Sequence, residues 1–133
     1  MSYPTQFRYT KDHEWIDVKG DVAKIGITDY AQHELGDVVF VELPAVGTTL
    51  TTGKTFSSVE SVKAVSEIYA PASGQVIEAN TELLNKPESI NSDPHGAGWL
   101  VKVKLSNPAE LSSLMDAKAY EAYIEEKKKE ASA

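Results

Sequence analysis

Residues 59–64 read Val-Glu-Ser-Val-Lys-Ala and lie between the two copies of a short internal repeat. The tetrapeptide Pro-Ala-Val-Gly at 44–47 recurs with one change, as Pro-Ala-Ser-Gly, at 71–74. Each copy follows a β-rich run and leads into another, and self-similarity at a constant spacing is a strong fold signal. We therefore expect a mainly β fold, a small two-fold sandwich that presents Lys63 on a connecting turn.

Length and composition place the chain among ordinary globular proteins. Its 133 residues suffice for one domain with a core, so we expect a single domain over 1–133. Hydrophobic residues make up 41% and charged residues 25%, which is typical of such domains. No apolar run approaches the roughly 18 residues of a membrane span, and the N-terminus lacks a secretion signal. These features predict a cytoplasmic protein that binds no membrane.

The charge balance and the lack of cysteine exclude several classes of function. Acidic residues outnumber basic ones by 20 to 13, for a net charge of −7, which argues against nucleic-acid binding. The basic run Lys127–Lys129 is bracketed by glutamates and predicts a solvated helix end. Without cysteine, the chain has no disulfide, Cys-ligated zinc site, iron–sulfur cluster or thiol nucleophile.

The first third of the chain predicts a hairpin followed by a short helix. Alternating apolar residues at 9–18 and 21–27 are typical of paired strands, and the Lys-Gly pair between them supplies the turn. Thr28 is a good helix N-cap and Gly36 a good stop. A helix is therefore expected at 28–35.

The rest of the chain predicts further strands and a C-terminal helix. Residues 61–63 are expected at or beside the tip of a second hairpin, and 83–98 is expected to be mostly loop. A capping signal at 107–110 predicts the start of the last helix, which packs on the sheet and frays after Glu125. The further strands are expected at 37–43, 48–52, 54–60, 64–69, 74–80 and 99–105.

One run of residues carries three side chains that are able to bind a metal. Asp12, His13 and Glu14 are consecutive, and consecutive residues on a strand point to opposite faces, so we expect them not to converge on one ion. His33 and His95 keep no ligand spacing to each other or to this run. We predict no metal site.

The sequence offers no self-contained catalytic set of nucleophile, base and orienting group. The serines around Lys63 form no Gly-x-Ser-x-Gly elbow, and the glycines form no phosphate loop. We therefore expect a non-catalytic carrier whose reactivity lies in a cofactor. A lone lysine near a turn is most often a solvated charge, so the residues alone leave the role of Lys63 open.

The sequence around Lys63 closely resembles the H proteins of the glycine cleavage system. The matching segments here are 60–64 (ESVKA), 66–71 (SEIYAP) and 74–76 (GQV). The resemblance covers about residues 7–125, the expected core. It implies a lipoyl/biotinyl-carrier-like β-sandwich, or flattened barrel, with a short helix in the N-terminal half and a helix at the C-terminus. Other matching segments are His13-Glu14-Trp15, 26–32 (GITDYAQ), 35–44 (LGDVVFVELP), 91–94 (NSDP) and 98–100 (GWL).

What the resemblance implies about function is concrete. Lys63 would carry one lipoic acid per chain, attached through an amide by a lipoyl-attaching enzyme. The arm would accept the aminomethyl group of glycine when the glycine decarboxylase component releases CO₂. It would present that group to the aminomethyltransferase component and then be reoxidised by dihydrolipoamide dehydrogenase.

The resemblance also implies a surface cleft that shelters the loaded arm. We expect Glu14 to hold the aminomethyl ammonium by a charge-assisted hydrogen bond, with Asp12 and Glu67 as further candidates. The alternative for Glu14 is an exposed strand carboxylate. For His13 and Trp15 we expect no catalytic role, Trp15 being a core residue.

Residues beside the attachment lysine are candidates for recognition by the attaching and partner enzymes. These candidates are Glu60, Ser61, Val62 and Ala64, and the alternative for Glu60 is a solvated hairpin acid.

Three other functions compete with this interpretation. A lipoyl module of a 2-oxoacid dehydrogenase usually belongs to a longer chain with linkers and an acyltransferase domain. Biotin-acceptor lysines typically lie between methionines, whereas Val62 and Ala64 flank Lys63. The third alternative is a relay that donates lipoyl groups to other proteins, or else a pure interaction module. The sequence does not separate the relay from glycine cleavage, because both need lipoyl-Lys63, whereas an interaction module would keep its partners after Lys63→Ala.

Overall fold

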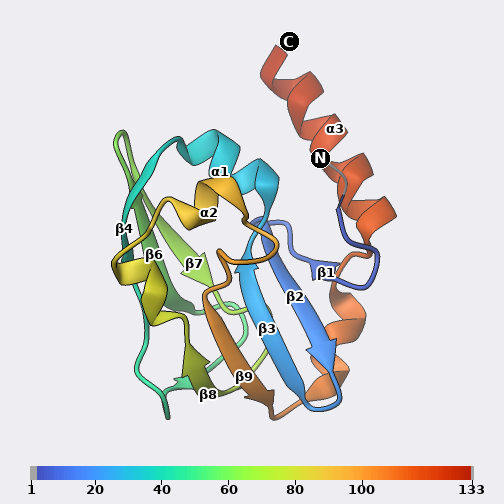
Figure 1. Cartoon of the computed structure of the whole chain (residues 1–133). Helices are drawn as coiled ribbons and strands as arrows, with labels where there is room; N and C mark the ends of the chain where they lie inside the picture. Colours follow the sequence, from blue (N-terminus) through green and yellow to red (C-terminus); the bar gives the residue numbers. More distant parts are fainter. Residues whose placement is uncertain (1–2, 133) are drawn as a thin grey trace.

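The computed structural model describes residues 3–132 and consists mainly of two antiparallel sheets (Figure 1). One sheet has the strand order β1-β2-β3-β9-β8-β5 and the other the order β4-β6-β7. The strands of the described chain are β1 (Arg8–Tyr9), β2 (Glu14–Lys19), β3 (Val22–Ile27), β4 (Val38–Glu42), β5 (Thr49–Leu50), β6 (Thr55–Ser61), β7 (Val65–Tyr69), β8 (Gly74–Ala79) and β9 (Val101–Leu105). Its α-helices are α1 (Asp29–Leu35), α2 (Ser89–Ser92) and α3 (Ala117–Ser132), and its 3₁₀ helices are η1 (Thr81–Leu84) and η2 (Pro108–Ser113). The predicted mainly β fold with an early short helix and a C-terminal helix is confirmed.

The main hydrophobic core draws on both sheets. In β9, Val101 and Val103 are buried while Lys104 is exposed, as the alternating pattern predicts. Val41 of β4 lies directly opposite Val59 of β6, and both side chains are fully buried. Burying apolar surface contributes about 25 cal/mol per Å². This core therefore joins the small sheet, which carries the hairpin β6–β7, to the large one.

A second, aromatic cluster attaches α3 to the edge of the large sheet. Phe7 stacks on Trp15 with ring centroids 4.5 Å apart, and Tyr9 stacks on Tyr120 of α3 at 4.7 Å. Trp15 is fully buried and its indole N–H donates a hydrogen bond to the carbonyl of Pro94 at 3.0 Å. The prediction that Trp15 is a core residue is confirmed. The stacked rings place α3 beside the turn that joins β1 to β2.

The predicted first hairpin and the short helix after it are confirmed at their turns and caps. Gly20 makes the β2–β3 turn with φ of 66°, a conformation that glycine adopts without strain. Thr28 caps α1, its hydroxyl accepting a hydrogen bond from the N–H of Ala31 at 3.2 Å. Gly36 ends the helix with φ of 86°.

The strand expected over 9–18 is interrupted, which corrects the sequence-based prediction. Residues 10–13 form a turn between β1 and β2. The hydroxyl of Thr10 accepts hydrogen bonds from the N–H groups of Asp12 at 3.2 Å and of Glu14 at 3.1 Å. His13 has a positive φ of 71°, rare for a residue with a side chain. Asp12 and His13 therefore lie in this turn and not on the predicted strand.

The two copies of the internal repeat occupy equivalent places but differ in local structure. Each connects a strand of the small sheet to a strand of the large one, β4 to β5 and β7 to β8, and β5 pairs with β8. Gly47 in the first copy lies in an exposed turn with φ of 95°. Gly74 in the second copy already belongs to β8, and a Cβ there would collide with the carbonyl oxygen of Lys104. The strand expected from Gly74 therefore begins where the sequence predicts it.

Two further predictions need correction in the C-terminal part of the chain. The expected loop at 83–98 contains α2 and the end of η1. The signal at 107–110 opens η2, and α3 begins only at Ala117, because Met115 exchanges two backbone hydrogen bonds with Tyr9, at 2.8 and 2.9 Å. The helix does not fray after Glu125 but continues to Ser132. Among residues 3–132 no helix has the length and apolar character needed to cross a bilayer.

Candidate functional site

Lys63 lies exposed at the tip of the hairpin β6–β7, where the sequence predicts it. Ser61 is only 5% exposed, and its hydroxyl accepts hydrogen bonds from the N–H groups of Lys63 at 3.2 Å and Ala64 at 3.1 Å. The N–H of Val62 donates to the carbonyl of Asp37 at 3.0 Å, which ties the tip to the start of β4. Ser61 therefore shapes the turn, while Lys63 remains accessible.

The aliphatic part of Lys63 lies against Gly36 at the end of α1. A Cβ placed on Gly36 would lie 3.4 Å from the Cε of Lys63, and the φ of 86° disfavours any side chain there. The positive φ is therefore the reason for glycine at this position, and a methyl group there would reach van der Waals contact with the lysine stem.

A groove begins next to the hairpin tip and runs between α1 and β7. Its first part has a volume of about 310 Å³. Apolar side chains dominate its wall, contributed by Ile27, Ala31, Leu35, Ala64, Val65 and Ile68. An arm that leaves Lys63 in this direction meets apolar surface first.

The groove continues into a wider, polar part of about 840 Å³. The two parts are neighbours, because both are lined by Asp12, His13, Val65 and Ser66. Further lining residues of the polar part are Lys11, Glu67, Tyr69, Tyr123 and Lys127. The groove thus extends from the hairpin to α3, with carboxylates and amines at its far end.

Glu14 lies behind the wall of the polar part rather than on the surface. It is 2% exposed, and its carboxylate accepts hydrogen bonds from the Thr10 hydroxyl at 2.5 Å and the N–H of Tyr69 at 3.2 Å. Burial raises the pKa of Glu14 to about 7, although the two hydrogen bonds oppose the shift. The alternative of an exposed strand carboxylate is therefore wrong for Glu14.

The structure brings two of the three predicted acidic residues to the surface of the groove and places the third, Glu14, behind its wall. Asp12 and Glu67 are exposed and line the polar part, and Tyr69, which donates to Glu14, lines it as well. A cation in this part of the groove would face the surface carboxylates of Asp12 and Glu67, with the carboxyl of Glu14, whose pKa is raised, behind the wall. Such an arrangement favours a positively charged guest.

His13 has a structural role that the sequence did not reveal. Its Nδ1 lies 2.8 Å from the hydroxyl of Tyr120, which is itself 2.7 Å from the hydroxyl of Thr28. The His13 ring packs on Tyr30 with centroids 4.6 Å apart, and burial lowers the pKa of His13. This network connects the groove wall to α3 and to the cap of α1. Only the spacing of tyrosines in the last helix hinted at it.

The outer face of the small sheet carries an apolar patch that no sequence pattern indicated. An irregularity in the β4–β6 register lies between Val38 and Phe40, and Phe40 is 52% exposed. Glu60 is exposed and lies directly between Phe40 and Val65 in the strand register. Val62 at the hairpin tip is 69% exposed. Glu60 and Val62 are thus available to a partner, whereas Ser61 is largely enclosed.

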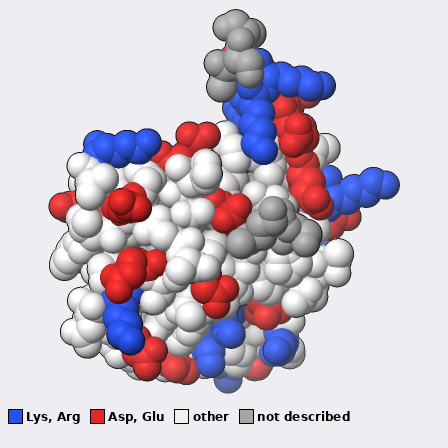
Figure 2. All heavy atoms as spheres, turned by 45° about the horizontal axis from the view of Figure 1, so that its top comes forward, with Lys and Arg blue, Asp and Glu red and all other residues white. Residues whose placement is uncertain are grey.

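Acidic side chains predominate over the face seen in Figure 2, and basic ones gather on the projecting helix and at the margins. Within residues 3–132 no three His, Asp or Glu side chains are grouped so that they could hold a metal ion. Asp12 is exposed while Glu14 is buried, so these two side chains of the Asp-His-Glu run do not share a surface.

Comparisons with known proteins identify the family of this chain. The family profile described as Glycine cleavage H-protein matches residues 7–127. The glycine cleavage system H protein of Acidobacterium capsulatum is 57% identical over 126 residues, covering 95% of this chain and 97% of that protein. That of Symbiobacterium thermophilum is 56% identical over 123 residues, covering 92% and 96%.

A solved structure shows the same fold. The crystal structure of a glycine cleavage system H protein from Mycobacterium marinum matches with a TM-score of 0.82 and 44% identity, covering 89% of this chain and 95% of that one. On its sequence and its fold, this chain belongs to the glycine cleavage H-protein family.

Proposed function

We propose that this protein is a lipoyl carrier of the glycine cleavage system, with Lys63 as the attachment residue. The observation that carries the proposal is the position of Lys63: exposed at a hydrogen-bonded turn and next to a groove that begins apolar and ends acidic. The chain acts as a non-catalytic component, because chemistry at the arm is performed by other proteins.

The residues around Lys63 fit a lipoyl group. Gly36 leaves room beside the lysine stem, and the apolar first part of the groove offers a hydrocarbon chain a surface on which to pack. Solvent exposure of Lys63 admits a lipoyl-attaching enzyme. A flexible tether of this kind raises the effective concentration of the arm at each partner site.

Lys63 would hold lipoic acid through an amide, and the group would supply a disulfide able to accept the aminomethyl carbon of glycine. The partners for loading, unloading and reoxidation would be the decarboxylase component, the aminomethyltransferase component and dihydrolipoamide dehydrogenase. The groove residues hold this cationic cargo and exclude water from it. Asp12 and Glu67 attract the ammonium at the surface, and Glu14 gives up its proton as the cation arrives, because a nearby positive charge favours the carboxylate form.

The outer face of the small sheet is the proposed recognition surface. Glu60 offers a carboxylate flanked by the exposed side chains of Phe40 and Val65, and Val62 and Ala64 flank the lysine itself. Ser61 contributes by holding the turn in the shape that the attaching enzyme meets.

A reconstituted exchange assay tests the proposal. The lipoylated chain, incubated with glycine, the decarboxylase component and labelled CO₂, is expected to support incorporation of label into glycine. Lys63→Arg keeps the charge but cannot form the amide, so it should abolish exchange. Equal exchange by the Lys63→Arg variant would contradict the proposal, and lipoylation without exchange would favour a lipoyl relay instead.

A further inference from the structure

Helix α3 forms the far wall of the polar part of the groove. Tyr123 and Lys127, one helical turn apart, line it together with Asp12 and Glu67. The Tyr123 hydroxyl donates a hydrogen bond to the carbonyl of Lys11 at 3.2 Å, which holds the ring against the turn that also carries Asp12. This hydrogen bond therefore fixes this part of α3 to the turn at 10–13, which lines the groove.

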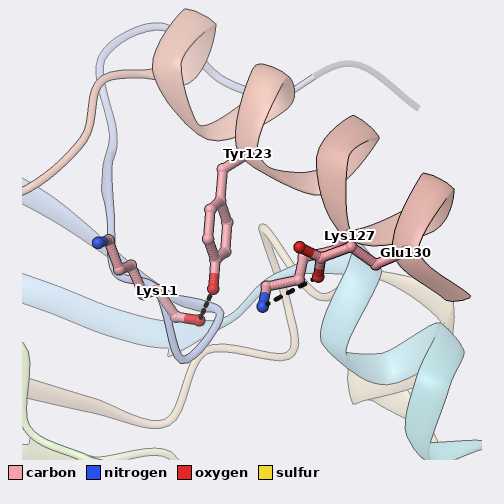
Figure 3. A network of polar contacts seen from close by, with 4 residues as sticks. All are labelled: Lys11, Tyr123, Lys127 and Glu130. Atoms are coloured by element: carbon pink, nitrogen blue, oxygen red, sulfur yellow. Dashed lines mark hydrogen bonds and ion pairs between the residues drawn. The ribbon is translucent and has the colours of Figure 1, made fainter.

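Lys127 is held at this wall by two contacts. Its Nζ lies 5.5 Å from the centroid of the Tyr123 ring and 3.6 Å from the carboxylate of Glu130. Figure 3 shows the side chain reaching back from α3 toward the Tyr123 hydroxyl and the Lys11 carbonyl. The expected solvated helix end thus has one half-buried lysine that lines the groove.

The charge of Lys127 reaches His13, which lines both parts of the groove. It lowers the pKa of His13, opposing Asp12 and Glu34, although burial remains the largest cause of that lowering. A cation entering the polar part therefore meets a resident ammonium as well as carboxylates. Like charges repel, whereas a neutral guest is insensitive to the resident charge.

We propose that Lys127 is a specificity-determining residue of the groove, whose ammonium competes with a cationic cargo for Asp12 and Glu67. This inference rests on the proposed function. Discrimination between two guests often uses a repulsive element next to an attractive one. Lys127 weakens retention of the loaded, positively charged arm and leaves the neutral, empty arm unaffected. The cargo is thereby kept releasable to the next enzyme.

A substitution of Glu130 should have the opposite effect to a substitution of Lys127. It is the partner of Lys127 and lies farther along the helix, where it does not line the groove. Glu130→Gln removes that carboxylate and leaves more of the lysine charge directed at the groove. Lys127→Gln and Glu130→Gln should therefore have opposite effects. Lys129→Gln is the matched control, because it makes the same charge change at an exposed position of the same helix.

The first readout needs no lipoyl group. NMR titration of the His13 ring in the unmodified chain should show its pKa raised by Lys127→Gln, lowered by Glu130→Gln and unchanged by Lys129→Gln. A Lys127→Gln variant in which the His13 titration matches that of wild type would show that the lysine charge does not reach the groove, which overturns the inference.

The second readout is the lifetime of the loaded arm. The lipoylated chain is loaded with [¹⁴C]glycine by the decarboxylase component and separated from it. Release of label is then followed as water converts the carried –S–CH₂–NH₃⁺ into a thiol, formaldehyde and ammonium. Lys127→Gln should lengthen the half-life by roughly two- to five-fold at low salt, the range of exposed charge pairs, and 0.5 M salt should reduce the difference. Glu130→Gln should shorten it.

The outcomes separate the two proposals. If lipoylated wild type takes up no label, the proposed function fails and the inference fails with it. If wild type loads normally and Lys127→Gln leaves the half-life equal or shorter, only the inference is overturned. A change as large in Lys129→Gln would also overturn it, because the effect would then reflect net charge rather than the position of Lys127.

Discussion

At the scale of single residues, Lys63 and Glu14 lie in opposite environments, and each environment suits the role proposed for the residue. Lys63 is exposed at a turn and so remains reachable. Glu14 is buried behind the groove, where desolvation raises its pKa to about 7. A carboxylate in this position changes charge near neutral pH and responds strongly to an arriving cation.

Glu14→Gln tests the role assigned to this carboxylate. The amide keeps the shape but loses the charge, so lipoylation at Lys63 should be unchanged while the half-life of the loaded arm falls by about ten-fold. The expected magnitude follows from a charge-assisted hydrogen bond, which contributes on the order of 1.5–3 kcal/mol. The half-life is measured by release of labelled carbon. Glu82→Gln, at an exposed position on η1, is the control, and an unchanged half-life in Glu14→Gln would refute the assignment.

Gly36→Ala tests the space beside Lys63. A side chain at φ of 86° is strained, and we expect a loss of about 1 kcal/mol in the free energy of unfolding, measured in urea. The new methyl would also come into van der Waals contact with the lysine stem, so the rate of enzymatic lipoylation should fall.

The matched control for that variant is Gly20→Ala. Gly20 has a φ of 66°, but a Cβ at this position would have nothing within 4 Å. It should lose similar stability and keep the normal rate of lipoylation. Equal lipoylation rates in both variants would show that Gly36 provides no room for the arm.

At the scale of elements, the hairpins and caps were predictable and the connections were not. Apolar runs on both sides of Gly20 identified β2 and β3, and the β-rich runs on both sides of 61–63 identified β6 and β7. The turn at 10–13 was missed because Thr10 organises it through bonds to backbone groups, which leave no periodic signal. The start of α3 was misplaced because Met115 pairs with Tyr9, far away in the sequence. Contacts between distant segments override local start signals.

Tyr120→Phe tests whether α3 is linked to the groove as an element. The hydroxyl of Tyr120 lies within hydrogen-bond distance of His13 and Thr28, and the ring is fully buried. Removing it should cost about 1–3 kcal/mol of unfolding free energy, because buried partners lose their hydrogen bonds. Tyr123→Phe, which loses one exposed bond to the Lys11 carbonyl, should cost about 0.5 kcal/mol. Equal losses in urea unfolding would contradict the proposed linkage.

At the scale of the whole molecule, the net charge affects which partner surfaces the protein binds and how fast it associates with them. The unmodified chain carries −7, and the proposed amide at Lys63 would remove one further positive charge. Excess negative charge favours partner surfaces that are basic and makes association rates sensitive to salt. The division into a single domain over 1–133 remains a prediction, consistent with a family match that covers 7–127.

The raised pKa of Glu14 predicts a pH dependence of global stability. Between the unfolded value of about 4.5 and the folded value of about 7, the folded chain holds a proton that the unfolded chain has lost. The stability that Glu14 contributes is therefore complete below pH 4.5 and is lost as the pH rises toward 7.

Glu14→Gln removes this dependence. Relative to wild type, the variant should gain about 3 kcal/mol in unfolding free energy between pH 4.5 and pH 7, given 1.36 kcal/mol per pKa unit. Urea unfolding at several pH values measures the difference. A constant difference across that range would show that Glu14 has an ordinary pKa in the folded protein.

Those residues of the candidate site that belong to a recognisable sequence motif could be predicted from the sequence. Lys63 was identified by its motif at a hairpin tip, and Asp12 and Glu67 do line the groove. The burial of Glu14 depends on how the turn at 10–13 closes over it, and the contribution of Lys127 depends on how α3 docks. The spacing of residues predicts neither the burial of Glu14 nor the position of Lys127, because both arise from packing between segments far apart in the chain.

The most direct test of the central claim is the intact mass of the native protein, followed by peptide mapping across Lys63. We predict a single addition equal to one lipoyl amide, located at Lys63. A mass equal to the bare chain, even after incubation with a lipoyl-attaching enzyme and lipoate, or an addition at another lysine, would contradict the account.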